Sequence, residues 1–130
     1  MTKKLILDTN AILRFILNDV PPQYKEVVDL IIKAKSKKIL LFIPEIVVFE
    51  IAFTLKSYYE YSKETVLNVL ESLLSAEYME VENKQTLLNA LKVYRETNLQ
   101  LVDCYLIAKS EIENTSLFTF DKNLRKYLLK

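Results

Sequence analysis

The stretch Lys4-Leu5-Ile6-Leu7-Asp8-Thr9-Asn10 constrains the fold most, because a short apolar run stops abruptly at a carboxylate. Such a run is typical of a buried strand, and Asp8 follows it directly. A strand that ends on an acid places that acid at the edge of a sheet, where open α/β folds bind their ligands. We therefore expect Asp8 to belong to a functional site at the edge of a sheet.

Along the rest of the chain, short apolar runs alternate with longer segments in which apolar residues recur at the spacing of a helix. The pattern predicts strands at 4–7, 39–43, 78–81 and 116–120, and helices at 11–17, 23–35, 44–59, 62–75, 83–97, 101–113 and from 121 onward. This alternation predicts a mostly parallel sheet with helices on both faces. With 130 residues, of which 51% are hydrophobic, the chain is expected to form a single domain over residues 1–130.

Three absences narrow the chemistry. The chain has no histidine, which excludes Ser-His-Asp catalysis and imidazole acid–base chemistry, and its one cysteine excludes a CxxC zinc site. It has no glycine, which excludes the P-loop and the GxGxxG fingerprint and leaves left-handed turns to Asn and Asp. The carboxylates that are left suit hard, oxygen-binding ions such as Mg²⁺ or Mn²⁺.

Hydropathy and charge indicate the surroundings of the protein. No apolar run reaches the roughly 18 residues of a membrane span, and the apolar run before Asp8 is too short for a signal peptide, so we expect a soluble, cytoplasmic protein. The net charge is only +1. If bound metal neutralised a cluster of acids, the other side chains would be distinctly basic, which would suit a polyanion such as RNA.

A helix predicted at 23–35 ends in a basic stretch that contains Lys33, Lys35, Lys37 and Lys38. We expect these lysines to be solvated and to interact favourably with the dipole at the helix C-terminus.

Four acids stand in apolar settings: Leu-Ile-Leu-Asp8, Val-Val-Phe-Glu50-Ile-Ala-Phe, Leu-Val-Asp103-Cys-Tyr-Leu-Ile and Leu-Phe-Thr-Phe-Asp121. An ionised carboxylate in apolar surroundings costs several kcal/mol unless it is paired or bound to metal. Two of these acids follow predicted strands and two lie on predicted helices that flank the strands. We therefore expect all four to meet at the carboxyl edge of the sheet, where they would repel one another strongly without cations.

Each acid also has a purely structural interpretation. Asp8 and Asp121 are suitable helix N-caps, and Asp103 is a suitable first-turn acid. Glu50 can face solvent or pair with a buried cation. Glu45 is the rival candidate for its role, although a first-turn acid that favours the helix dipole explains Glu45 well.

The order of these motifs resembles that of a PIN domain over nearly the whole chain. The matching residues are Leu-Asp8-Thr9-Asn10, then Ile-Pro44 with Glu50 six residues on, then Leu-Val-Asp103-Cys-Tyr-Leu-Ile-Ala and finally Phe-Thr119-Phe-Asp121-Lys122. Among PIN domains, the short stand-alone form is similar to the VapC toxins of type II toxin–antitoxin pairs. The chain departs from the family pattern in its lack of glycine, and it ends where relatives often continue into another strand.

The resemblance implies a Rossmann-like three-layer α/β/α sandwich around a central, mainly parallel sheet of four or five strands. It implies a Mg²⁺- or Mn²⁺-dependent endoribonuclease that cleaves RNA, is inhibited by a VapB-like antitoxin and forms a homodimer. The family's catalytic, metal-binding acids fall on Asp8, Glu50, Asp103 and Asp121. The polar residue that supports them falls on Thr119, and Asn10 matches the first motif.

Two other functions stay open at this point. One is a non-catalytic PIN-like module that binds RNA or protein, although the presence of all four acids argues against a decayed site. The other is a phosphatase-like domain that uses Asp8 as its nucleophile. Such enzymes usually carry a second acid two residues on, where this chain has Asn10.

Overall fold

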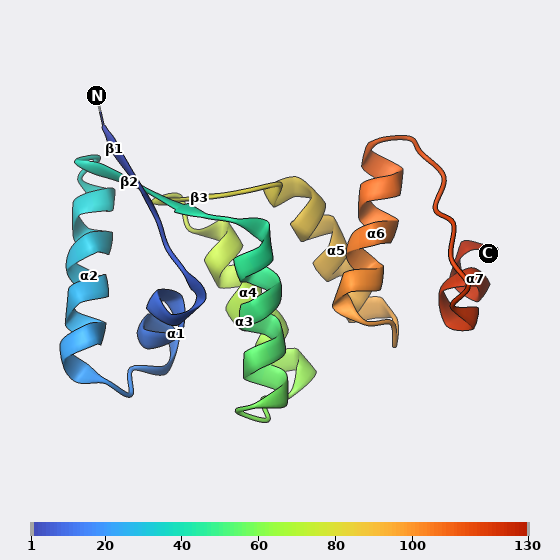
Figure 1. Ribbon diagram of the computed structural model, residues 1–130, viewed down its shortest axis with the longest axis horizontal. Helices are drawn as coiled ribbons and strands as arrows, with labels where there is room; N and C mark the ends of the chain where they lie inside the picture. The colour runs from blue at the N-terminus through green and yellow to red at the C-terminus, as the bar shows by residue number, and fades with distance from the viewer. Residues whose placement is uncertain (1, 130) are drawn as a thin grey trace. The chain divides into compact units, whose positions relative to one another are not determined.

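The computed structural model of the protein describes residues 2–129. Its elements, in chain order, are β1 (Lys3–Ile6), α1 (Thr9–Leu17), α2 (Pro21–Lys35), β2 (Ile39–Ile43), α3 (Glu45–Ser57), α4 (Lys63–Ser75), β3 (Met79–Val81), α5 (Lys84–Glu96), α6 (Leu101–Ile112) and α7 (Lys122–Leu128) (Figure 1). The chain groups into two compact units, one up to Glu82 and one from Asn83 onward.

The first unit is built on a parallel sheet in the order β1-β2-β3. In the register of the strands, Leu5 lies beside Leu41, and Leu41 lies beside Met79. Leu41 and Ile43 of the central strand are completely buried. Alternate residues of a strand point to opposite faces, so these apolar side chains form one buried face of the sheet.

The four helices of the first unit lie on this buried face (Figure 1). Each strand is added on the same side of the one before it, and right-handed crossovers then place every connecting helix on the same face. The opposite face is open within the unit: Ile6 is 67% exposed there, and Lys4 forms a salt bridge with Glu80. Within the first unit, helices therefore cover one face of the sheet.

The second unit is helical. Helices α5 and α6 pack along each other, and each buries one side, with Leu87 and Leu91 on α5 and Ile107 on α6. Helix α7 follows an irregular segment and buries Leu124. Cys104 is fully buried in α6, as expected of a cysteine that serves as a small hydrophobic residue.

The predicted strand at 116–120 is wrong. Within residues 2–129 the sheet has three strands, fewer than the four or five expected, and residues 115–121 have no regular secondary structure. The apolar residues of this segment gave the pattern of a strand, but a strand also needs a partner, and no strand is found in residues 83–129. Phe118 and Phe120 are accordingly 77% and 79% exposed.

The other elements confirm the α/β class, and most of their bounds differ from the predicted ones by no more than about two residues, a normal uncertainty for helix ends. No helix among the described residues is long and apolar enough to cross a membrane.

The central strand gives a direct test of the core. Replacing the fully buried Leu41 with alanine should lower the free energy of unfolding by about 2–5 kcal/mol, because it removes apolar contacts and leaves a cavity. Urea denaturation should show a lower midpoint with an unchanged slope. The matched control is Leu40→Ala on the same strand, where the side chain is 38% exposed and the loss should be clearly smaller. Equal losses for the two variants would contradict the described orientation of β2.

Candidate metal-binding site

Asp8 is separated from the end of β1 by Leu7 and is the N-cap of α1. Its backbone is extended, and its Oδ1 accepts a hydrogen bond of 2.8 Å from the backbone N–H of Ala11. The side chain therefore caps the helix, as its structural interpretation predicts. The cap engages one carboxylate oxygen, and the exposed carboxylate keeps its second oxygen for a ligand.

Glu50 lies on α3, which begins just beyond β2. The hydroxyl of Thr9 donates a 3.2 Å hydrogen bond to Oε2 of Glu50, and this bond joins the start of α1 to the middle of α3 across 41 positions of the sequence. Glu50 is exposed, and no Lys or Arg among residues 2–129 forms an ion pair with it. The interpretation of Glu50 as the partner of a buried cation is therefore wrong. The hydrogen bond from Thr9 instead places Glu50 near the first motif, in which Asp8 directly precedes Thr9.

Glu82 is an acid at this edge that the sequence analysis missed. It follows β3 as Asp8 follows β1, and its backbone N–H donates to the carbonyl of Ile43. Its Oε1 accepts a 3.0 Å hydrogen bond from the backbone N–H of Glu45, the first residue of α3. Its position directly after an alternating strand was the available signal. Glu82 therefore holds the start of the helix that carries Glu50.

The second unit brings Asp103 and Asp121 into electrostatic contact. Asp103 lies in the first turn of α6 and is half-buried, whereas Asp121 is the N-cap of α7. Burial raises the pKa of Asp103 above its ordinary value, and the negative charge of Asp121 raises this pKa further, while a backbone hydrogen bond at Gln100 opposes both effects. The negative charge of Asp121 thus disfavours the ionised form of Asp103.

Thr119 and Asp121 form a local hydrogen-bonded turn. The backbone N–H of Asp121 donates to the Thr119 hydroxyl over 3.0 Å, and Asp121 Oδ1 accepts from the N–H of Leu124 over 2.9 Å. Arg125 Nε donates to the Thr119 carbonyl over 2.6 Å. These bonds fix the carboxylate of Asp121 at the start of α7, so Thr119 contacts the acid that it was predicted to support.

The predicted acids therefore fall into two pairs, Asp8 with Glu50 in the first unit and Asp103 with Asp121 in the second. Within each unit, no group of three His, Cys, Asp or Glu side chains among residues 2–129 is close enough to hold a metal by itself. Asn10 lines a hollow of about 580 Å³ between α1 and α2, and none of the four predicted acids lines that hollow.

The donor set fits a hard divalent cation. Both pairs offer carboxylate oxygens, and Thr9 adds a hydroxyl beside the first pair, which are the ligand types that Mg²⁺ and Mn²⁺ prefer. The raised pKa of Asp103 adds a second reason, because a bound cation would favour the ionised form of this carboxylate.

The chain is similar to known proteins. A family model described as "PIN domain" matches residues 5–128 of the chain. A VapC ribonuclease from Aquifex aeolicus (strain VF5) is 28% identical over 107 residues, which cover 82% of this chain and 78% of the relative.

Asp103→Asn should stabilise the metal-free protein at neutral pH. A raised pKa means that the folded protein binds the Asp103 proton more tightly than the unfolded chain does. The contribution of Asp103 to the free energy of unfolding is therefore complete below its ordinary pKa of 3.8. It is lost as the pH rises through the raised pKa of the folded protein. Asparagine cannot ionise, so the variant's melting temperature should exceed that of the parent at pH 7 and match it near pH 3. An equal difference at both pH values would show that ionisation of Asp103 does not cause it.

Proposed function

The chain belongs to the PIN domain family, and on that premise we propose that it is a Mg²⁺- or Mn²⁺-dependent endoribonuclease, the toxin of a VapBC-type pair. The observation that carries the proposal is the pairing of the four acids. Each pair sets one helix-capping aspartate beside a second acid on another helix. In the second pair the negative charge of Asp121 helps to raise the pKa of Asp103, and a bound cation would offset that repulsion.

We assign Asp8, Glu50, Asp103 and Asp121 as the metal ligands and catalytic residues. When bound, one or two divalent ions would lower the pKa of a water molecule and neutralise the charge that develops on the scissile phosphate of RNA. The caps of Asp8 and Asp121 orient their free oxygens before the ligand arrives. Thr9 orients Glu50, and Glu82 holds the helix on which Glu50 lies.

The absence of histidine supports this assignment, because metal-assisted hydrolysis needs no imidazole. The relative's printed name, VapC ribonuclease, supports RNA as the substrate. As further parts of the proposal, the protein is a single PIN domain, forms a homodimer in the cytoplasm and is inhibited by a VapB-like antitoxin.

A non-catalytic module that binds RNA or protein is the alternative in another functional class. It would bind RNA without cutting it, whatever metal is present. Incubation of the protein with labelled single-stranded RNA in Mn²⁺, with and without EDTA, separates the two functions. The proposal requires cleavage in Mn²⁺ that EDTA abolishes and that an excess of Mn²⁺ restores.

Substitution of the acids tests their assignment. Asp8→Asn and Glu50→Gln should each lower the cleavage rate more than about 100-fold, because each removes a charged ligand, whereas loss of a group that only supports a ligand typically costs 10–100-fold. The Asp8→Asn variant should keep its melting temperature, since asparagine also caps helices well.

Glu45→Gln is the matched control, because Glu45 lies on the same helix and was the rival candidate. It should cleave RNA at close to the parent rate. The assignment would be wrong if Asp8→Asn were fully active, or if Glu45→Gln lost activity and Glu50→Gln did not.

A further inference from the structure

Four lysines gather at the amino edge of the sheet, the edge opposite Asp8. Lys33 and Lys35 lie in the last turn of α2, and Lys37 and Lys38 lie in the turn that leads into β2. All four are exposed, and none forms a salt bridge within residues 2–129. These four residues are called the lysine cluster below.

The lysine cluster borders a hollow of about 530 Å³. Lys35, Lys37 and Tyr78 line this hollow, together with one acid, Glu77. The Lys35 ammonium lies 5.0 Å from the centre of the Tyr78 ring, a cation–π contact that holds one positive charge at the rim. The hollow therefore combines an aromatic ring with more positive than negative charge.

The helix dipole explains only part of the cluster. Lysines in the last turn of α2 favour the helix C-terminus, but Lys37 and Lys38 lie beyond the last helical residue. Lys37 has φ of 62°, the left-handed region that asparagine or glycine adopts at lower cost. Three of the five residues with positive φ in residues 2–129 are indeed asparagine, namely Asn18, Asn83 and Asn114. Lysine at this turn therefore opposes the backbone preference, which points to a use for its side chain.

We propose that the lysine cluster binds the sugar–phosphate backbone of RNA outside the cleavage site, an inference that rests on the proposed function. Lysines that neutralise phosphates release condensed counterions and so contribute affinity without reading sequence. The five residues of β2 separate the cluster from the carboxyl edge by roughly 16 Å at about 3.3 Å per residue. The cluster therefore contacts nucleotides that flank the scissile bond, and it holds the RNA without taking part in the chemistry.

The test measures the binding of a labelled 20-nucleotide single-stranded RNA, in EDTA to prevent cleavage, over a series of salt concentrations. In Lys35→Ala/Lys37→Asn, affinity near 0.1 M salt should fall about tenfold or more. The slope of log K against log salt should become less steep by about 1.4, since each phosphate contact contributes roughly 0.7 for a single strand. In Mn²⁺, KM for the same RNA should rise by a similar factor, while kcat stays unchanged.

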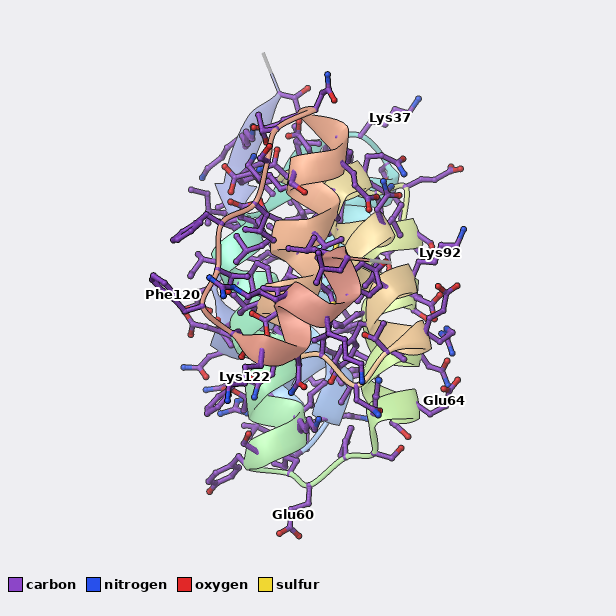
Figure 2. The ribbon with its side chains drawn as sticks, turned by 90° about the vertical axis from the view of Figure 1, so that its right-hand side faces the viewer. Lys37, Glu60, Glu64, Lys92, Phe120 and Lys122 are labelled. Atoms are coloured by element: carbon purple, nitrogen blue, oxygen red, sulfur yellow. The ribbon has the colours of Figure 1, made fainter. Side chains whose placement is uncertain are left out.

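The matched control is Lys25→Ala/Lys92→Ala, which removes two exposed lysines outside the cluster and should change the slope little. Figure 2 shows the side chains of Lys37 and Lys92 both extending away from the ribbon into solvent. The single variant Lys37→Asn should bind RNA more weakly and yet melt at the same temperature or higher, because asparagine tolerates the left-handed turn. This combination separates a binding role from a structural one.

The outcomes distinguish this inference from the function on which it rests. In one outcome the parent protein cleaves RNA, and the Lys35→Ala/Lys37→Asn and Lys25→Ala/Lys92→Ala variants bind RNA with the same affinity and the same salt dependence. The lysine cluster is then not an RNA-binding site, and the inference fails while the proposed function stands. A fall in kcat at unchanged KM would also overturn it, because that result would place the lysines in the chemistry. If the parent protein neither binds nor cleaves RNA, the proposed function fails and the inference fails with it.

Discussion

The order in which the strands join the sheet is the constraint on which the rest of the first unit depends. Each strand of β1-β2-β3 is added on the same side of the previous one, so right-handed connections bring every helix to one face. Parallel strands also share one carboxyl edge, where the next helices begin. Asp8, Glu45 and Glu82 gather at that edge because each stands just where a strand has ended. The geometry of the chain, more than any single contact, therefore concentrates negative charge there.

Structural and chemical roles coincide in the two capping aspartates. Asp8 and Asp121 each use one oxygen to accept a backbone N–H at a helix start, which satisfies a donor that the helix itself cannot. A capping carboxylate is held in one orientation by a bond that folding requires in any case. Asp8 and Asp121 can therefore be both helix caps and metal ligands, because the cap uses one carboxylate oxygen and leaves the other for a ligand.

The sequence predicted the local structure well and the long-range structure in part. The strand before Asp8, the stripe of α2 and the cap at Ser62 are each determined by neighbours along the chain, and all three are confirmed. The segment 116–120 has a strand-like pattern, but strand formation depends on a partner that periodicity cannot reveal. The contacts of Glu50 with Thr9 and of Glu82 with α3 were hidden for the same reason, because they join residues 41 and 37 positions apart. The sequence was enough to identify the acids as candidate metal ligands, but it could not predict the hydrogen bonds that orient them.

The turns of this chain have a consequence for its unfolded state. Every described left-handed residue carries a Cβ, since the sequence has no glycine. An unfolded chain without glycine samples fewer backbone conformations, so folding costs it less entropy at these turns. Lys37 and Glu60 offset part of that gain with strain in the native state. The absence of glycine therefore stabilises the folded state by restricting the unfolded chain, and backbone strain at the exposed residues Lys37 and Glu60 cancels part of this stabilisation.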